Sequence, residues 1–377
     1  MMWKFPLYEV GQPIDWDLIE STYDWVSDMR DVPQDTIWHQ EGDVFIHTKM
    51  VVEALIGLSE FIGLTEENKH IVFTAALMHD IEKRSTTTHE IEDGLDRIRS
   101  HKHSQRGEST IRGILYKEID TPFETREHIA KLVRLHSLPL WAIEKEDPNK
   151  AVIRASLDVN TFLLAMLAKA DILGRIANDN DDMLYRVELF KELCKDNRCF
   201  GNEREFNAPL DRYTYLNRKG FAPATEFFDA RKFTVYVIAG LPGTGKDYFI
   251  QQELSDLHVL SLDDIRREHK IKPTDKKGNG RVIQMGKEKA KELMREKLNF
   301  VYNATNITRD MRSKWISLFQ EYGGYVKIIY LEVPYKKLLS QNKNREYPVP
   351  EDVIEKLIYK LDIPSCAEAP EIIFQIK

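Results

Sequence analysis

The chain has 377 residues, of which 42% are hydrophobic and 31% charged, a composition typical of globular domains and not of disordered segments. That length predicts two domains, because one domain usually takes about 100–200 residues. A formal net charge of −7 argues against a general polyanion binder, three cysteines without a CxxC pair argue against a disulfide framework, and apolar runs far shorter than the ~20 residues of a bilayer span argue against a membrane protein.

The first half of the chain is predicted to be helical. Apolar residues recur at helical spacing in four segments, which are 51–58, 71–78, 129–135 and 161–176. Thr65 precedes two glutamates and is therefore a candidate N-cap. No alternating strand pattern stands out before residue 232. We therefore predict an all-α N-terminal domain over residues 1–200.

The sequence pattern changes after this domain. Residues 201–231, rich in glycine, proline and aromatic side chains, are interpreted as a linker. Apolar, β-branched runs typical of buried parallel strands then occur at 233–239, 259–262 and 325–331. Strands that alternate with helices predict an α/β domain with a parallel sheet over residues 232–377, in which ligands bind at the carboxyl ends of the strands.

A series of histidines and aspartates runs through the predicted helical domain. Imidazoles combined with carboxylates are typical ligands of a divalent cation, and a carboxylate shared by two such cations suits attack of water on a phosphoester. A lone helical histidine is more often a core or capping residue, so the joint pattern supports the prediction. The candidate ligands are His47, His79, Asp80, His103, His136 and Asp171, with His101 and His128 as rivals of the third and fourth histidines.

The sharpest motif follows the first predicted strand, where Gly240-Leu-Pro-Gly243-Thr244-Gly245-Lys246 matches G-x-x-x-x-G-K and opens a helix. Backbone N–H groups of such a loop and the helix N-terminus bind phosphates, and Lys246 can reach the β- and γ-phosphates. We expect these residues to bind ATP or another NTP with Mg²⁺. Asp247 stands where Ser or Thr normally ligates the metal. Its carboxylate either holds Mg²⁺ itself, which we favour, or marks a loop that binds nucleotide without turnover.

A second polar cluster follows the second predicted strand. Asp263 is placed to accept a proton from an attacking hydroxyl, and Arg266 to bind a phosphate of the acceptor. The alternative for Asp263 and Asp264 is helix capping. Residues 264–297 hold twelve Lys or Arg against six acids, an excess that attracts a phosphate backbone, although residues 288–297 alone read better as a solvated helix with ion pairs.

Residues 233–360 resemble the phage-type 5′-hydroxyl polynucleotide kinases. The resemblance rests on the P-loop, on Asp263-Asp264-x-Arg266, on Thr305-Asn306, and on the Asn342-Lys-Asn-Arg345 stretch. It implies that Asp263 is the general base, that Arg266 binds the acceptor phosphate, and that Arg345 is a lid arginine on the donor phosphates. Ala304 and Gln341 depart from the family pattern and put details of donor contact in question.

Residues 35–180 resemble the HD-domain phosphohydrolases, in the order H…HD…H…H…D. The resemblance implies two divalent cations such as Mn²⁺: one held by His47, His79, Asp80 and Asp171, the other by His103 and His136, with Asp80 bridging. Lys83 and Arg84 are then candidate phosphate contacts, or else ordinary surface charges. Glu82 replaces a usual glycine. His39 and His89 lie close in sequence but cannot be placed.

The whole chain resembles the bacterial HD-Pnk proteins. This resemblance implies phosphorylation of 5′-hydroxyl ends and removal of 2′,3′-cyclic or 2′-phosphate ends on RNA or DNA, in the cytoplasm, with a separately encoded ligase as a possible partner. One alternative is a nucleotide phosphohydrolase fused to a small-molecule kinase, and another is a nucleotide-sensing regulator with a non-catalytic P-loop. The early tryptophans (Trp3, Trp16, Trp25 and Trp38) are interpreted as core residues in preference to base-stacking ones.

Overall fold

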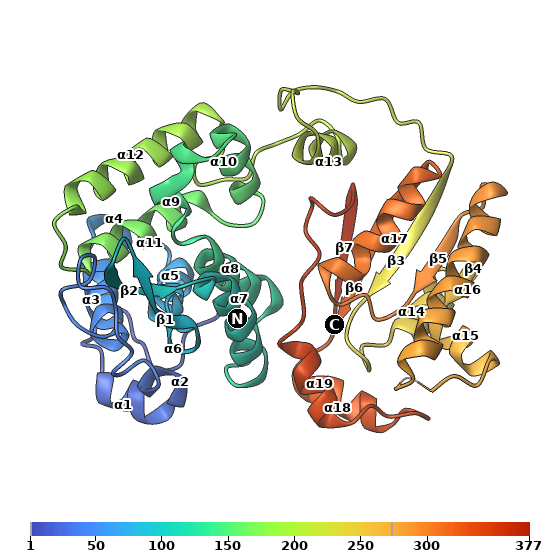
Figure 1. Ribbon diagram of the computed structural model, residues 1–377, viewed down its shortest axis with the longest axis horizontal. Coiled ribbons are helices and arrows are strands. Elements are labelled where there is room, and N and C mark those ends of the chain that lie inside the picture. Colours follow the sequence, from blue (N-terminus) through green and yellow to red (C-terminus); the bar gives the residue numbers. More distant parts are fainter. Residues whose placement is uncertain (1, 273) are drawn as a thin grey trace. The chain divides into compact units, whose positions relative to one another are not determined.

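The computed structural model describes residues 2–272 and 274–377. Contacts within the chain define two compact units, one ending at Arg204 and the other beginning at Glu205 (Figure 1). The fold class predicted from the sequence is confirmed, since the first unit is mainly helical and the second contains a parallel sheet.

The first unit is built from short and medium helices. Their bounds are α1 Trp16–Thr22, α2 Asp24–Ser27, α3 Val44–Gly57, α4 Ser59–Ile62, α5 Glu66–Met78, α6 Lys83–Thr86, α7 His103–Lys117, α8 Phe123–Leu135, α9 Leu138–Trp141, α10 Pro148–Ser156, α11 Thr161–Leu173 and α12 Asn180–Asp196. Each of the four predicted helical segments overlaps a helix, although 51–58 and 161–176 extend past the ends of α3 and α11. Thr65 is the N-cap of α5, its hydroxyl accepting from the Asn68 amide at 3.3 Å.

Helices α3, α5, α8 and α11 form the centre of this unit, with α3 in contact with α5 and α11, and α5 in contact with α8. Gly174, just after α11, shows how close this packing is. A Cβ at that position would lie 2.5 Å from the backbone of Val51 in α3. The missing side chain therefore lets the end of α11 approach α3, which brings Asp171 towards His47.

The expectation that no strand precedes residue 232 is wrong. Strands β1 (Thr87–Glu92) and β2 (Leu95–Ser100) form an antiparallel hairpin. Its turn is Asp93-Gly94, and both residues have positive φ (52° and 78°), which fits the Asp-Gly signature of a tight hairpin. The strands are mostly polar and half-exposed, so the apolar alternation that marks a buried strand is missing.

The second unit contains a five-stranded sheet in the order β4-β5-β3-β6-β7, in which all neighbouring strands are parallel. The strand bounds are β3 Phe233–Ala239, β4 His258–Ser261, β5 Phe300–Asn303, β6 Gly324–Glu332 and β7 Glu371–Ile376. The helix bounds are α13 Pro209–Asn217, α14 Lys246–Glu253, α15 Leu262–Glu268, α16 Lys276–Arg295, α17 Arg309–Glu321, α18 Tyr335–Lys343 and α19 Glu351–Ile358.

Alternating side chains of β5 show why helices cover both faces of this sheet. Val301 packs with Phe249 and Ile250 of α14 in one apolar cluster. Its neighbour Tyr302 stacks near Trp315 of α17, with ring centroids 4.3 Å apart. Since successive strand residues point to opposite faces, α14 and α17 must lie on opposite sides of the sheet. Strands β3, β4 and β6 match the three predicted runs, whereas β5 and β7 were not predicted.

The segment predicted as a linker, 201–231, contains helix α13. Tyr213 of this helix contacts Gln320 of α17, and Asn217 donates to the Ala367 carbonyl at 3.0 Å. Much of this segment therefore packs within the second unit. Within residues 2–272 and 274–377, no single helix is long and apolar enough to cross a membrane, and α10 with α11 reaches that length only as a pair bent by 108°.

A buried charge network joins α7 to α8. Arg112 is 1% exposed and lies 2.9 Å from Glu108 and 2.8 Å from Glu127, while Lys131 lies 2.9 Å from Glu108. Burial alone would raise the pKa of Glu108, but Arg112 and Lys131 outweigh it and lower that pKa to about 2. The Glu108 carboxylate therefore stabilises the fold above its ordinary pKa of 4.5, and this contribution is lost as the pH falls from there towards about 2.

We expect Glu108→Gln to lower the free energy of unfolding by about 3 kcal/mol at pH 7, because it removes the carboxylate that the buried cations Arg112 and Lys131 share. The difference from the wild type should narrow between about pH 4.5 and pH 2. Denaturant unfolding at several pH values measures it. Glu188→Gln, which breaks an exposed pair with Lys191, is the control and should change stability little. A difference that does not depend on pH would contradict this account.

Candidate functional site

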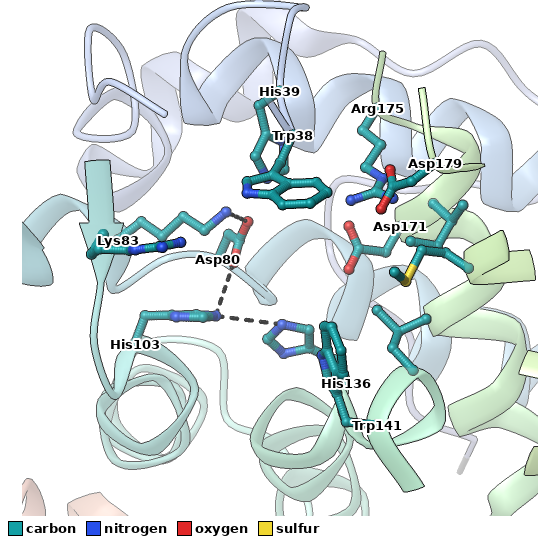
Figure 2. Close-up of a pocket in the computed structure, with 14 residues that line it drawn as sticks. Trp38, His39, Asp80, Lys83, His103, His136, Trp141, Asp171, Arg175 and Asp179 are labelled. Carbon is teal, nitrogen blue, oxygen red and sulfur yellow. Dashed lines mark hydrogen bonds and ion pairs between the residues drawn. The ribbon is translucent and has the colours of Figure 1, made fainter. Parts of the chain in front are cut away.

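Five helices of the first unit bring the six predicted ligands into one cluster. Each ligand lies in, or next to the end of, a helix: His47 in α3, His79 and Asp80 after α5, His103 at the start of α7, His136 after α8 and Asp171 in α11. Figure 2 shows Asp80, His103, His136 and Asp171 converging on one cavity.

The orientation of three imidazoles is fixed by backbone carbonyls. Nδ1 of His79 lies 2.8 Å from the Ala76 carbonyl oxygen, Nδ1 of His103 2.8 Å from that of Ser100, and Nδ1 of His136 2.7 Å from that of Val133. A carbonyl only accepts, so Nδ1 must carry the proton, and Nε2 of the neutral ring presents its lone pair.

These lone pairs face each other. Nε2 of His79 lies 3.3 Å from Nε2 of His47, and Nε2 of His103 lies 3.4 Å from Nε2 of His136. Two ring nitrogens at that separation repel each other unless a proton or a metal cation lies next to both. The donor set therefore fits two cation positions, one beside each pair of rings.

Asp80 lies between the two pairs. Its Oδ2 is 3.2 Å from Nε2 of His79, and its Oδ1 is 3.3 Å from Nε2 of His103. The carboxylate is 2% exposed, and Oδ1 makes no hydrogen bond with any residue that the structure describes. Asp171 Oδ1 lies 3.1 Å from Nε2 of His47. A buried acceptor of this kind suits a shared cation ligand, and it gives the cluster the geometry of two half-sites joined by Asp80.

The two half-sites differ in charge. Burial alone would lower the pKa of His47, but Asp171 and Glu41 outweigh it and raise that pKa to about 9. His136 has no such partner, so burial lowers its pKa to about 4, and burial also lowers the pKa of His103. The pair formed by His103 and His136 is therefore neutral at physiological pH, which is the state in which imidazole binds a metal ion.

Glu41 is a functional residue that the sequence analysis missed. Its side chain is 1% exposed and lies 3.0 Å from Nδ1 of His47 and 2.8 Å from Nδ1 of His39. It also accepts from the Ile176 amide at 2.8 Å, just beyond α11. A carboxylate behind a ligating imidazole orients the ring and raises its basicity. Nothing in the sequence around Glu41 indicates this role without knowledge of what packs behind His47.

The rival histidines lie elsewhere. His128 accepts from the Asn160 amide at 3.1 Å, and exposed His101 pairs with Glu90. His89 lies in the exposed hairpin, near Asp96. His39, which could not be placed from the sequence, lines the cavity.

Of the two predicted phosphate contacts, Lys83 lines the cavity and Arg84 does not. The Lys83 ammonium lies 2.7 Å from Asp80 and donates to Gln34 at 2.8 Å. Arg84 instead pairs with Asp28, so among the described residues its guanidinium has a structural partner away from the cluster. Glu82 is buried and accepts from Thr110 at 2.9 Å, which holds the turn that carries Lys83.

The second unit places the glycine-rich loop directly after the central strand β3. Gly240, Gly243 and Gly245 have φ of 149°, 91° and 85°, a region that side chains disfavour. A Cβ at Gly240 would also lie 2.5 Å from the Leu331 carbonyl oxygen. Thr244 closes the loop, its hydroxyl donating to the Leu241 carbonyl at 2.9 Å. The loop therefore has the conformation that a phosphate-binding nest requires.

Lys246 begins helix α14 beneath this loop. Its ammonium donates to the carbonyls of Gly240 and Leu241, both at 2.9 Å. Burial lowers its pKa to about 8, with Arg345 contributing and Asp247 opposing. A bound phosphate would raise this pKa again and stabilise the charged lysine, because it places an anion beside the ammonium.

Arg345 is exposed in the loop after α18, where its charge still acts on Lys246. Buried Asn342 closes this loop with two hydrogen bonds to Val349, at 2.7 and 3.0 Å. Gly243 lies against the same helix, since a Cβ there would be 3.1 Å from the Leu338 carbonyl oxygen. The arginine loop and the P-loop are thus held close together.

Asp247 forms a hydrogen bond that the sequence did not predict. The Asn303 amide, at the carboxyl end of β5, donates to its carboxylate at 2.7 Å. The Thr305-Asn306 pair holds the loop in place, since Gly240 donates to the Thr305 carbonyl at 3.0 Å and Asn306 donates to the Ile238 carbonyl at 2.7 Å.

Asp263 and Arg266 lie in α15, directly after β4, and pair with each other. The cap of this helix is Ser261, whose hydroxyl accepts from the Asp264 amide at 3.1 Å, so neither aspartate is the N-cap. The Asp263 side chain is 60% exposed, and its charge is felt at Lys246. Arg266 also donates to Asn279 at 2.9 Å, which links α15 to the start of α16.

Comparison with known families agrees with these two sites. The model of the HD domain matches residues 44–190, which span the imidazole-carboxylate cluster. The model of an AAA domain matches residues 235–364, which span the P-loop, Asp263 and Arg345. The chain therefore joins an HD phosphohydrolase domain to a P-loop kinase-like domain.

Solved structures match the chain only distantly. They include a putative kinase from Chloroflexus aurantiacus J-10-fl (14% identity, 39% of this chain and 89% of that chain, TM-score 0.34). A sugar kinase from Janibacter sp. HTCC2649 follows (15%, 38% and 85%, TM-score 0.30), and a gluconokinase from Sinorhizobium meliloti 1021 (13%, 39% and 83%, TM-score 0.28). No curated protein matches the chain.

We expect chelator-treated protein to bind two equivalents of Mn²⁺ and to gain about 2.7 kcal/mol per site at a free concentration of 100 times Kd. Calorimetric titration and thermal unfolding measure this. His79→Ala and His136→Ala should each lose an equivalent, because each removes one ring of a facing pair. His101→Ala, outside the cluster, should behave like the wild type. Equal binding by all the proteins would rule out the assignment.

Proposed function

We propose that the protein repairs nucleic-acid ends, removing 2′,3′-cyclic or 2′-phosphates with its HD domain and phosphorylating 5′-hydroxyls with its P-loop domain. The observation that carries this proposal is the presence, in one chain, of an imidazole-carboxylate cluster suited to two cations and a P-loop with an acid-arginine pair beside it. The proposal agrees with the resemblance of the whole sequence to bacterial HD-Pnk proteins. RNA or DNA ends are the substrates, and a separately encoded cytoplasmic ligase would join the healed ends.

In the HD domain, the two half-sites would hold divalent cations such as Mn²⁺, which supply an activated water and neutralise charge on the phosphoester. Asp80 bridges the half-sites, and Glu41 fixes the ring of His47. Lys83 adds a positive charge beside Asp80, 12% exposed at the cavity wall, where it can meet a phosphate oxygen. These residues bind and orient the phosphoester and balance its charge.

In the kinase domain, the glycine-rich loop and Lys246 would hold the phosphates of ATP or another NTP, and Arg345 would approach them from its loop. Asp263 accepts the proton of the attacking 5′-hydroxyl, for which its exposure is an advantage. Arg266, paired with Asp263, binds the neighbouring phosphate of the acceptor strand and keeps the base and the acceptor in register.

Helix α16 supports a polynucleotide acceptor. It carries seven basic and two acidic side chains. Lys276, Lys277 and Arg281 are exposed near its N-terminus, where the helix dipole disfavours positive charge. A bound polyanion would offset the repulsion between these basic side chains and the helix dipole, and would therefore stabilise this end of the helix. Because Arg266 donates to Asn279 at the start of α16, this surface continues directly from the proposed acceptor phosphate site.

The proposal predicts separable activities on an oligonucleotide that bears a 5′-hydroxyl and a 2′,3′-cyclic phosphate. Incubated with NTP and divalent metal, the wild type should heal both ends. Lys246→Ala should lose 5′-phosphorylation by a factor of about 10²–10³ and retain phosphoesterase activity, and Asp80→Ala should show the reverse. Gel analysis of both ends measures this, with Lys195→Ala, an exposed lysine paired with Glu192, as a control outside both sites. Healing of both ends by both variants, or turnover of mononucleotides alone, would refute the proposal.

We also propose that Asp247 ligates Mg²⁺ and that Asn303 positions it. P-loop enzymes usually pair a hydroxyl in the loop with an acid at a neighbouring strand end, whereas here the acid is in the loop and the amide is at the strand end. Asp247→Ser should therefore abolish the Mg²⁺-dependent part of nucleotide binding. Asp247→Ser with Asn303→Asp should restore it, because the carboxylate is then supplied by position 303 and its hydrogen-bond partner by position 247. Calorimetry with and without Mg²⁺ measures this, and no rescue in the double variant would contradict the pairing.

A further inference from the structure

Two exposed tryptophans line the cavity above the imidazole-carboxylate cluster. Trp38 is 37% exposed and Trp141 41% exposed, although indole is among the most apolar of side chains. Figure 2 shows Trp38 on one side of Asp80 and Asp171 and Trp141 on the other. The interpretation of the early tryptophans as core residues fits Trp3 and Trp25, which are buried, but it is wrong for Trp38.

The ring of Trp141 is covered by an arginine that does not line the cavity. The guanidinium of Arg186 lies 4.8 Å from the centre of the ring. Arg186 is itself anchored, since it donates to the Leu140 carbonyl at 3.1 Å and to Glu144 at 2.6 Å. Because Arg186 does not line the cavity, the part of the indole that borders the cavity is not the part that the guanidinium covers.

Trp38 lies in a turn that is fixed at both ends. Its amide donates to the Asp35 carbonyl at 3.0 Å, and the Asp35 carboxylate pairs with Arg97 of the hairpin at 3.0 Å. On the other side, the Gln40 amide donates to the Ile176 carbonyl at 3.0 Å. These hydrogen bonds and this ion pair hold a large apolar ring at the surface. Stacking of a planar ligand on the ring would cost little conformational entropy, because the backbone of the turn is already ordered.

The cavity has a size and chemistry that suit one nucleotide. Its volume is about 370 Å³, near the lower end of small-ligand pockets. Its floor holds Asp80, His103 and His136, where the phosphoester binds under the proposed function. Its walls add the two indoles and the cations Lys83 and Arg99. Aromatic rings stack on any nucleobase, so such walls recognise a base without selecting its identity.

We propose that Trp38 and Trp141 form a nucleobase subsite, which holds the base of the terminal nucleotide while its phosphate lies at the histidine-aspartate cluster. The subsite adds base recognition to the proposed phosphoesterase function, and it rests on that function for the position of the phosphate. It makes the phosphoesterase specific for a nucleotide end, with little preference among the four bases.

Two substrates test the subsite in the full-length protein. One is an oligoribonucleotide ending in a 2′,3′-cyclic phosphate, and the other is methyl ribofuranoside 2,3-cyclic phosphate, which has no base. Stacking is worth about 5- to 150-fold per base, so Trp38→Ala and Trp141→Ala should each lower kcat/KM for the oligonucleotide by that factor. Neither should change kcat/KM for the base-free substrate. Tyr185→Ala, which removes a 64% exposed aromatic outside the cavity, is the matched control.

A binding measurement separates the subsite from the chemistry. An oligoribonucleotide whose terminal base is 5-iodouracil is irradiated with the protein, and the crosslinked peptide is identified by mass spectrometry. Crosslinks to Trp38 or Trp141 support the subsite, even if the cyclic phosphate is not hydrolysed and the phosphoesterase proposal fails. Crosslinks elsewhere, together with an equal effect of the tryptophan variants on both substrates, overturn the subsite while the hydrolysis stands. Unchanged Mn²⁺ binding by the variants shows that the cluster is intact.

Discussion

The close approach of four imidazole Nε2 atoms, in two facing pairs, is the constraint on which the site of the first unit depends. Each pair of Nε2 atoms is only 3.3 or 3.4 Å apart, and three of the rings cannot turn away because a backbone carbonyl holds Nδ1. The helices converge so closely that the arrangement needs positive charge at its centre. Gly174 permits this convergence, since any side chain there would meet the backbone of α3. The packing of the helices therefore determines both the fold of the first unit and the geometry of the cluster.

The second unit has the opposite electrostatic requirement, because its proposed ligands are anions. Under the proposed function it binds several phosphates, which bind best to a cation that no carboxylate already neutralises. Lys246 donates to two carbonyls instead of a carboxylate, and its lowered pKa reflects that arrangement. The nearest acids have partners of their own, with Asp247 held by Asn303 and Asp263 by Arg266. Each charged group is thus oriented before substrate binds.

Much of this could be predicted from the sequence, because the strongest signals are local. The P-loop between a strand and a helix, the His79-Asp80 pair at a helix end and the long apolar runs each carry their meaning within a few residues. Features that depend on distant partners were missed. Glu41 acquires a role only from His47 and Ile176, Asn303 only from Asp247, and Trp141 only from the cavity that it borders. The hairpin was missed because its strands are mostly polar and their few apolar residues do not alternate regularly, although its Asp-Gly turn was visible.

The carboxylate of Glu41 lies against both His39 and His47 and also accepts from the amide of Ile176. The turn that bears Trp38 therefore shares an anchor with the innermost ring of the cluster. A displacement of this turn would therefore also shift the ring of His47, so the entrance and the floor of the cavity are structurally coupled.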